Sequence, residues 1–267
     1  MIRVAVAGAA GRMGTEVVRA VWRAEDLMLV AALDVRRVNA DAGVLAGLGE
    51  IGVPVRRDLE EVLDEVRPDV LVDFTAAAAA VQNARAALNR GVRPVVGTTG
   101  IPAADLEELA RLSAARGVGA VVAPNFALGA VLMMRFAAEA ARFFPHVEII
   151  ELHHDQKVDA PSGTALKTAE VLAAVRGDAR RGMPAEELKL PGVRGGTYDG
   201  GIRIHSVRLP GLVAHQEVIF GGTGQTLTIR HDSTSRESFM PGVLLAVRKV
   251  VELKGLVHGL DRLLFEG

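Results

Sequence analysis

The sequence predicts an α/β protein of two domains: an N-terminal, doubly wound parallel sheet, and a C-terminal α+β domain built on a mixed, mostly antiparallel sheet. Short apolar runs alternate with helical patterns over roughly the first 125 residues, which is typical of consecutive strand-helix units. Between residues 200 and 230, apolar and polar residues alternate instead, and the turn signals Pro210-Gly211 and Gly221-Gly222 interrupt them. The length of 267 residues is also sufficient for two domains.

The first domain begins with the apolar run 2–7, which we expect to form a strand because a glycine-rich turn and a helical pattern follow it. That helix covers residues 13–23, and the apolar run 27–33 predicts a second strand. The same alternation then predicts a helix at 59–66, a strand at 70–74, a helix at 76–90, a strand at 92–97, a helix at 105–116 and a strand at 119–123.

The second domain has a different order of elements. We expect a helix at 130–143, a strand at 147–152, a helix at 165–175, a glycine-rich loop at 192–201 and strands at 202–209, 212–220 and 225–231. A helical pattern returns at 239–254, and we expect this helix to pack back on the first domain. We therefore predict a dinucleotide-binding domain of residues 1–126 plus 240–267, and a substrate-binding and oligomerisation domain of residues 127–239.

Composition and charge favour a small-molecule partner. The 31 basic and 32 acidic residues give a net charge of −1, so bulk electrostatics favour neither a nucleic acid nor a membrane. The absence of cysteine excludes disulfides, thiol nucleophiles and cysteine-ligated metals. We find no signal peptide and no apolar run long enough to span a membrane, and we expect a cytoplasmic protein.

The turn from Gly8 to Gly14 predicts a dinucleotide site. It lies between a strand and its helix, where backbone N–H groups bind a pyrophosphate in Rossmann-type domains, although its G-x-x-G-x-x-G spacing departs from the usual fingerprint. Asp34 stands 20 residues after Gly14, where a carboxylate accepts hydrogen bonds from the adenosine ribose. Asp34 favours NAD, whereas Arg36, Arg37 or Arg12 can accommodate the phosphate of NADP, so the choice between the two cofactors stays open.

Three short polar segments follow later strands of the same domain. They are Asp73 to Thr75, Gly97 to Gly100 and Ala123 to Phe126. Ligands of open α/β sheets bind at the carboxyl ends of the strands, so we expect these segments to contact the nicotinamide ribose and carboxamide. Each segment alone is also compatible with an ordinary turn.

The densest cluster of reactive residues is the run from Glu151 to Ala165, E-L-H-H-D-Q-K-V-D-A-P-S-G-T-A. Histidine exchanges protons near neutral pH, and Lys157 adds a fixed positive charge four positions after His153. The helix start at Ser162-Gly163-Thr164 presents N–H groups that bind carboxylates or phosphates. We interpret the run as an active site for an anion. The alternative of a solvated charged loop holds for any single residue, and a metal site at residues 153–155 is disfavoured because adjacent side chains on a strand point to opposite faces.

Together these motifs make the chain similar to the 4-hydroxy-tetrahydrodipicolinate reductase family, also called dihydrodipicolinate reductases. The resemblance covers nearly the full length. It rests on V-A-G-A-A-G-R-M-G at 6–14, V-D-F-T at 72–75, V-G-T-T-G at 96–100, P-N-F at 124–126 and, most specifically, the run at 151–165. The segment from His215 to Phe220, Gly224, His231 and Ser235-Arg236 also resembles the C-terminal pattern of the family.

The resemblance implies hydride transfer from NADH or NADPH to a small cyclic unsaturated dicarboxylate, with release of water, in the diaminopimelate and lysine pathway. It implies His153 as proton donor and acceptor and Lys157 as second proton donor, with no metal. It places a substrate carboxylate at His154, Gly163 and Thr164. The cofactor contacts that it implies are Gly8, Ala9, Ala10, Gly11, Arg12, Met13, Asp34, Gly97, Thr98, Thr99, Ala123, Pro124, Asn125 and Phe126.

Two further points follow from the resemblance. Family members often have an arginine directly after the ribose-binding acid, and this chain has Val35 there, which leaves its affinity for the phosphorylated cofactor open. Family members are typically homotetramers, so we expect a homotetramer.

Two other functions compete with this interpretation. A dehydrogenase of the same two-domain plan that acts on another small acid is disfavoured by the His-His-x-x-Lys pattern. A nucleotide-sensing regulator without catalysis would need a DNA-binding helix or a basic patch, and the sequence contains neither.

Overall fold

In the computed structural model, which describes residues 1–176 and 187–265, the chain divides into two units. Unit 1 contains Met1–Leu128 and Phe239–Gly267, and unit 2 contains Gly129–Ser238. The boundaries expected from the sequence, 126/127 and 239/240, lie close to these, and the roles assigned to the two domains stay predictions.

Unit 1 is built on a parallel sheet that has seven strands among the described residues, in the order β12-β6-β5-β4-β1-β2-β3. The chain starts at the inner strand β1 and adds β2 and β3 on one side. It then crosses over to add β4, β5, β6 and β12 on the other side, so the switch in direction lies between β1 and β4. The strands are β1 (Ile2–Ala7), β2 (Leu27–Leu33), β3 (Val55–Arg56), β4 (Val70–Asp73), β5 (Arg93–Val96), β6 (Ala120–Val122) and β12 (Leu256–His258).

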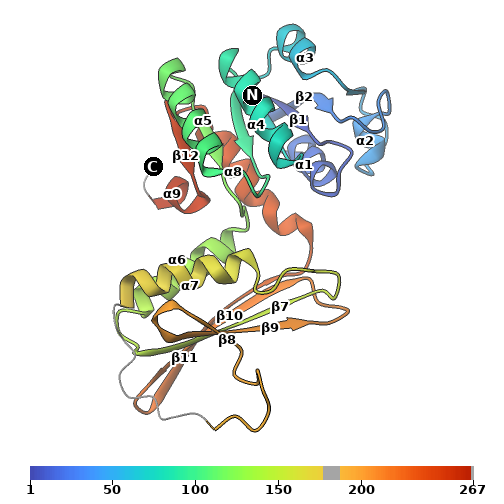
Figure 1. Ribbon diagram of the computed structural model, residues 1–267. Helices are drawn as coiled ribbons and strands as arrows, with labels where there is room; N and C mark the ends of the chain where they lie inside the picture. Colours follow the sequence, from blue (N-terminus) through green and yellow to red (C-terminus); the bar gives the residue numbers. More distant parts are fainter. Residues whose placement is uncertain (177–186, 266–267) are drawn as a thin grey trace. The chain divides into compact units, whose positions relative to one another are not determined.

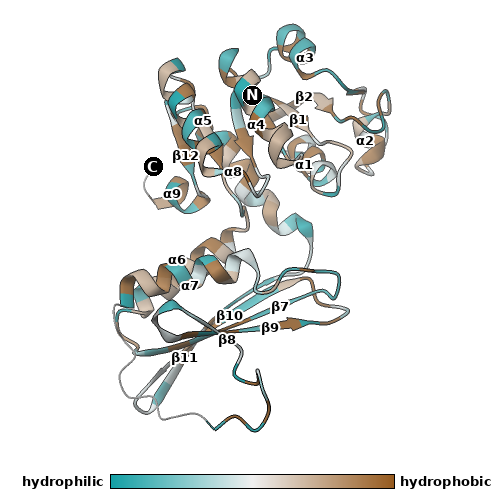
Figure 2. Ribbon diagram, viewed as in Figure 1, coloured by the Kyte–Doolittle hydropathy of each residue, from teal (hydrophilic) through white to brown (hydrophobic). Residues whose placement is uncertain are grey.

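Helices cover both faces of this sheet (Figure 1). One layer packs on β1, β2, β4, β5 and β6 through α3 (Leu59–Val66), α4 (Ala77–Asn89) and α5 (Ala103–Arg116). The other layer contains α1 (Arg12–Arg23) and α8 (Met240–Val250), with α2 (Ala42–Leu45) beside α1 and α9 (Leu260–Phe265) beside α8. Figure 2 shows hydrophobic residues along these strands, and consecutive strand residues such as Val70, Leu71 and Val72 are buried because helices cover each face.

Unit 2 has a five-stranded sheet, counted over its described residues, in the order β11-β10-β7-β9-β8. The strands are β7 (His146–His153), β8 (Gly196–Tyr198), β9 (Ile202–Arg208), β10 (Ala214–Gly222) and β11 (Gln225–Ser233). β7 and β9 run parallel and the other neighbours antiparallel, so the expectation of a mixed, mostly antiparallel sheet is confirmed. Two helices, α6 (Leu128–Ala140) and α7 (Gly163–Arg176), lie over one face (Figure 1).

The core of unit 2 explains which sheet face the helices cover. Val147, Ile149, Val218 and Phe220 are buried and alternate along β7 and β10 with half-buried residues, as expected for a sheet with one covered face. The polar pair Gln216 and Thr168 joins the sheet to α7 within this core, through a bond of 2.8 Å from Nε2 to Oγ1. Side chains on the same face of β7 therefore point toward the helices.

Several short elements were not expected from the sequence. They are β3, β8, β12, α2 and α9, and two short 3₁₀ turns, Asp199–Gly201 and Arg236–Phe239. The helix expected at 239–254 ends at Val250, and β12 and α9 follow it. The glycine-rich loop expected at 192–201 contains the edge strand β8. Strands of two or three residues carry no periodic signal of their own, since the pairing partner stabilises them.

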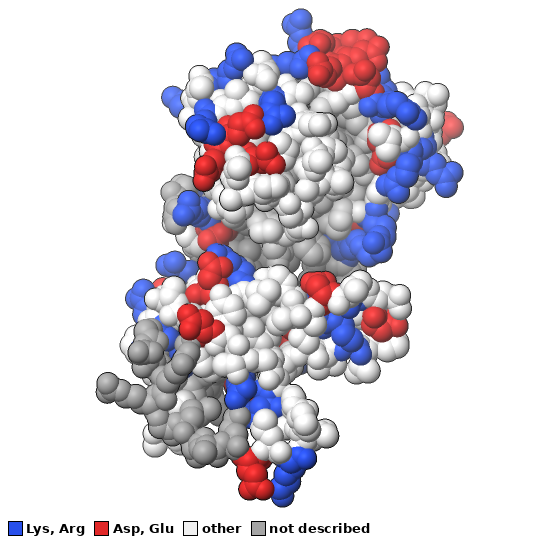
Figure 3. Space-filling view, in the orientation of Figure 1, with Lys and Arg blue, Asp and Glu red and all other residues white. Residues whose placement is uncertain are grey.

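Charged side chains of both signs are spread over the face seen in Figure 3, in keeping with the net charge of −1. A group of acidic residues gathers on α3, where Arg56 and Arg90 form ion pairs with Glu61, Glu65, Glu60 and Asp64. Among the described residues, no helix is long and apolar enough to cross a membrane.

Candidate active site

The glycine turn of unit 1 connects β1 directly to α1. Gly8 has a φ of +79°, and a Cβ on Gly14 would lie only 2.0 Å from the carbonyl oxygen of Gly8. Both positions therefore require glycine, because any side chain would meet backbone or strain the turn. Gly11 is the N-cap of α1 and no side chain caps this helix end, so the N-terminal N–H groups face the turn itself. This is the geometry that dinucleotide-binding turns use for a pyrophosphate.

Asp34, at the end of β2, is joined to the glycine turn by hydrogen bonds. Its carboxylate accepts from the backbone N–H of Ala10 at 3.1 Å and of Arg36 at 2.9 Å, and its side chain is only 5% exposed. A cavity of about 440 Å³ lies beside it, lined among others by Gly8, Leu33 and Arg57. The Asp34 carboxylate lies beside the turn and next to a cavity, and this placement fits the adenosine end of a dinucleotide.

The three polar segments at the strand ends are packed against one another. A Cβ on Gly97 would lie 2.1 Å from the ring of Phe74, and the rings of Phe74 and Phe126 lie 6.0 Å apart between centroids. Thr98 Oγ1 also donates to the carbonyl oxygen of Thr75 at 3.3 Å. The structure thus brings the predicted residues Gly97, Thr98 and Phe126 together at the carboxyl edge of the sheet, with Thr99, Ala123, Pro124 and Asn125 beside them in the chain.

Asp73 is a buried residue that binds polar side chains at this edge of the sheet. It is fully buried and accepts hydrogen bonds from Thr75 Oγ1 at 2.7 Å and from Asn83 Nδ2 at 2.7 Å. Burial raises the pKa of Asp73 above its ordinary value, although these hydrogen bonds and one from Thr98 oppose the shift. Asp73 therefore positions the polar segments and is itself out of reach of a ligand.

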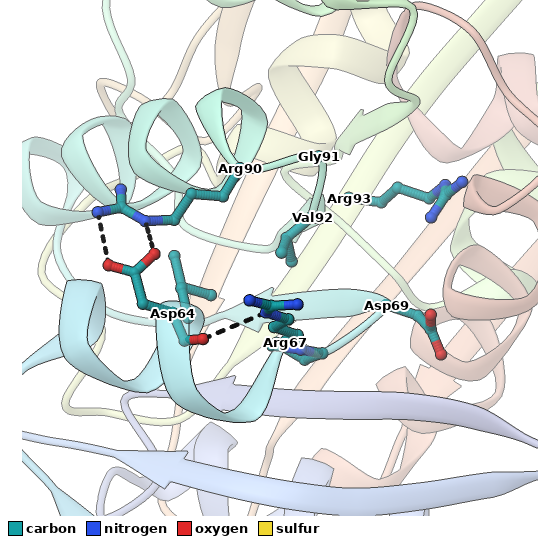
Figure 4. A pocket seen from close by; sticks show the side chains of 9 residues that line it. Asp64, Arg67, Asp69, Arg90, Gly91, Val92 and Arg93 are labelled. Carbon is teal, nitrogen blue, oxygen red and sulfur yellow. Dashed lines mark hydrogen bonds and ion pairs between the residues drawn. The ribbon is translucent and has the colours of Figure 1, made fainter.

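A second hollow, of about 460 Å³, lies at the opposite edge of the same sheet, where β4 and β5 begin. Figure 4 shows Arg67 and Arg90 both turned toward Asp64. Arg90 pairs with the Asp64 carboxylate at 2.7 Å, and Arg67 Nε donates to the Asp64 carbonyl at 3.4 Å. These cations stabilise the C-terminal ends of α3 and α4. Ligands of open α/β sheets bind at the carboxyl edge instead.

In unit 2, His153 ends β7 and is bound to a buried acid. Its Nδ1 lies 2.5 Å from Glu151 Oε2, two residues back on the same face of the strand. Arg208, directly opposite His153 on β9, binds both oxygens of Glu151 at 2.9 and 2.8 Å. Burial raises the pKa of Glu151, but hydrogen bonds from His153, Arg208 and Ser206 outweigh burial and lower the pKa to about 2. Glu151 is therefore a fixed negative charge behind the imidazole.

The other predicted residues lie in the loop after β7 and at the start of α7. His154 is exposed, and Lys157 is half-buried with Nζ at 2.8 Å from both oxygens of Asp159. Gly163 and Thr164 are the first two residues of α7, and a buried serine, Ser162, precedes them and accepts from the N–H of Ala165. This helix start, one imidazole and one ammonium thus belong to a single short loop, which suits a carboxylate ligand.

Comparisons with known proteins decide the family. The family model described as dihydrodipicolinate reductase, N-terminus, matches residues 2–126, and the model for the C-terminus of the same family matches residues 129–264. The chain belongs to the dihydrodipicolinate reductase family. It is 62% identical over 263 residues to the 4-hydroxy-tetrahydrodipicolinate reductase of Moorella thermoacetica, and 56% identical over 264 residues to that of Desulfitobacterium hafniense (strain DSM 10664 / DCB-2), covering 98% of both chains in each case.

Solved structures agree with this assignment. A dipicolinate-bound dihydrodipicolinate reductase from Paenisporosarcina sp. TG-14 superposes with a TM-score of 0.88 at 47% identity, covering 98% of this chain and 99% of that one. An amine dehydrogenase from Mycobacterium smegmatis, at 20% identity and a TM-score of 0.69, shares the fold alone. The family and the fold class predicted from the sequence are confirmed.

Some residues that contact the candidate site were not predicted as site residues. Glu151 begins the run singled out in the sequence but was assigned no role, and Arg208, which binds it, is the last residue of β9 and carries no motif of its own. Arg57 lines the cavity near Asp34 and donates to the carbonyl of Val35 at 3.2 Å. It follows β3, a strand too short to be expected, so its position could not be foreseen.

Proposed function

We propose that this chain reduces 4-hydroxy-tetrahydrodipicolinate to tetrahydrodipicolinate with NADH or NADPH, using His153 and Lys157 for proton transfer. The observation that carries the proposal is the match of both halves of the chain to one reductase family, at up to 62% identity to a reductase of that name. Membership of this family makes the chain an oxidoreductase of diaminopimelate and lysine biosynthesis.

The residues of unit 1 fit a nicotinamide dinucleotide. The turn of Gly8, Ala9, Ala10, Gly11, Arg12 and Met13 has the glycine-dependent close approach that a pyrophosphate needs, and Asp34 is held beside it for a ribose. When bound, the reduced nicotinamide supplies the hydride. Asp34 supports NADH, while Arg36 and Arg57 line the same cavity and support NADPH, so we propose that the chain uses both.

The residues of unit 2 provide acid catalysis and anion binding. His153 donates a proton to the reduced ring, and Lys157 stabilises or protonates the developing negative charge. His154 and the N–H groups of Gly163 and Thr164 hold one substrate carboxylate, because a helix start favours an anion. The relative solved with dipicolinate supports a small cyclic dicarboxylate as the class of ligand.

We further propose a homotetramer in the cytoplasm. The sheet face of unit 2 opposite α6 and α7 carries half-buried apolar side chains, Ile150, Val207 and Ile219 among them, which suits an interface between copies of the chain. Light scattering of the purified protein should give four times the mass of 28.2 kDa. A monomeric mass would contradict this assembly.

A coupled assay tests the reaction. The purified chain is mixed with the freshly made product of the preceding synthase and with NADH or NADPH, and loss of absorbance of the reduced nicotinamide is followed. We expect substrate-dependent oxidation of both cofactors and tetrahydrodipicolinate as product by mass spectrometry. Absence of turnover with either cofactor would contradict the proposed function.

A further inference from the structure

Glu151 occupies a position that the fold would otherwise fill with an apolar residue. Val147 and Ile149 precede it on the core face of β7 and are buried, and Glu151 itself is 0% exposed. Burying an ion pair often contributes nothing to stability compared with a packed apolar residue, because both charges lose their hydration. A buried acid at this position therefore calls for an explanation beyond folding.

The partners of Glu151 supply that explanation. One oxygen accepts from the backbone N–H of Ser162 at 3.2 Å and from Arg208 Nη2, and the other lies against His153 Nδ1 and Arg208 Nη1. Arg208 also donates to the carbonyl oxygen of Asp159 at 2.7 Å. The carboxylate thus connects the end of β7, the loop after it and the start of α7, which are the segments that carry the proposed catalytic and anion-binding groups.

We infer that Glu151 and Arg208 are positioning residues for His153. Glu151 keeps the proton of the neutral ring on Nδ1, so that Nε2 is the atom that exchanges a proton with the substrate, and Arg208 holds the carboxylate ionised and in place. This inference rests on the proposed role of His153 as the proton donor.

The electrostatics of the pair are consistent with this role. The pKa of Glu151, lowered to about 2 by its hydrogen-bond partners against the effect of burial, keeps it charged throughout the range in which such a reductase operates. A carboxylate at Nδ1 fixes the tautomer and the ring orientation of a histidine and favours its protonated form. His153 contacts Glu151 on β7 and is paired in register with Arg208 on β9, while Lys157 and Asp159 in the following loop pair with each other.

The variant Glu151→Gln tests the inference, because it keeps the shape of the side chain and removes its charge. We expect kcat to fall by roughly 10²-fold with KM changed by less than about threefold, which is the range of general-acid catalysis. The protonated ring loses its neighbouring charge, so the alkaline limb of the kcat profile should move to lower pH. Added to His153→Gln, the second change should cause no further loss.

Glu148→Gln is the matched control. Glu148 lies on the opposite face of the same strand and also binds an arginine and a histidine, Arg194 at 2.5 Å and His205 at 2.8 Å. We expect this variant to keep the pH profile of the unmodified protein when compared at equal oligomeric state. An equal shift in both variants would mean that any charge on β7 acts through the fold, and would overturn the inference.

A readout without turnover separates this inference from the proposed function. Diethyl pyrocarbonate modifies unprotonated imidazole, and peptide mass spectrometry gives its rate at His153 as a function of pH. We expect the midpoint of that curve to move to lower pH in Glu151→Gln. If the unmodified protein has no reductase activity but the midpoint moves, the proposed function fails alone. If activity is present but neither the midpoint nor the kcat profile moves, the positioning role fails alone.

Loss of folding does not obstruct the test. Should Glu151→Gln unfold because the half-buried Arg208 loses its carboxylate partner, the double variant Glu151→Gln/Arg208→Gln removes both charges. We expect it to melt cooperatively and to show the same low kcat. A folded double variant with the unmodified kcat and pH profile would overturn the inference.

Discussion

At the scale of single residues, an ion pair orients the proposed lysine of the site. In the loop between β7 and α7, Asp159 accepts hydrogen bonds from Lys157 through both oxygens, and these bonds lower the pKa of Asp159 below its ordinary value. The ion pair with Asp159 orients the half-buried Lys157 side chain in this loop. A substrate carboxylate that approaches this loop meets a positive charge whose position is already set.

Removing either proposed proton donor should affect turnover and leave cofactor binding intact. We expect His153→Ala and Lys157→Ala each to lower kcat on the order of 10²-fold or more. Calorimetric titration with NADH should give a Kd within about twofold of the unmodified value, since the predicted dinucleotide contacts all lie in unit 1. Wild-type turnover in both variants would remove the chemical roles assigned to these residues.

Residue types and spacing indicate candidate site residues most readily where the signal is local in the sequence. The run from Glu151 to Ala165 and the glycine turn are contiguous in the chain, and the structure keeps each as one compact segment. Arg208 lies 57 positions after Glu151, and only the parallel pairing of β7 with β9 brings them together. Contacts of this kind depend on strand register, which the sequence of one strand does not determine.

At the scale of elements, the structure depends on close backbone approach at the start of α1. Gly14 lies in the first turn of this helix and packs directly against the carbonyl of Gly8. Long elements with a clear period were predicted nearly to their ends, as β2 shows, whereas β3 and β12 exist through pairing with β2 and β6. Short edge elements therefore follow from the sheet that they join rather than from their own residues.

Adding one methyl group at Gly14 should disturb the predicted dinucleotide turn. In Gly14→Ala the new Cβ would lie 2.0 Å from a backbone oxygen, so the turn and the helix must separate. We expect a loss of about 1–3 kcal/mol in the free energy of unfolding, the usual cost of overpacking, and at least a tenfold weaker NADH affinity. Urea denaturation and calorimetric titration measure the two effects.

Gly255→Ala is the control for this substitution. Gly255 precedes β12 in the same unit and does not have a positive φ, and a methyl group added there would meet no other part of the protein within 4 Å. The stability and cofactor affinity of this variant should match those of the unmodified protein. Equal losses at both positions would show that the close approach at Gly14 is not the cause.

At the scale of the whole molecule, each unit has apolar clusters of its own. One cluster in unit 2 joins α6 and α7 to the sheet through residues such as Leu172 and Ile149, and separate clusters in unit 1 lie under α3, α4 and α5. The return of the chain to unit 1 was expected from a helical pattern near the C-terminus, and α8 indeed packs on β4, β5 and β6. We therefore expect a mutation that removes a contact within one unit to lower the stability of that unit.

The buried acid of unit 2 makes the acid stability of that unit predictable. Because the folded pKa of Glu151 is lowered from 4.5 to about 2, its contribution to stability is present above the unfolded value and is lost as the pH falls through this interval. The contribution at neutral pH is on the order of 3 kcal/mol. Glu151→Gln should lower stability at pH 7 by a similar amount, and the difference should become small near pH 2, where the carboxyl of the unmodified protein is about half protonated.

Hydrogen exchange measured by mass spectrometry checks both the size and the location of this effect. At pH 7 we expect faster exchange in β7, β9 and α7 of Glu151→Gln, and unchanged exchange in β1, β4 and β5, because the hydrogen bonds of Glu151 all lie within unit 2. Glu108→Gln, which removes an exposed ion pair with Arg85 in unit 1, should change exchange little in either unit. Equal acceleration in the strands of unit 1 would show that the two units unfold as one, and would contradict the local assignment of this stability.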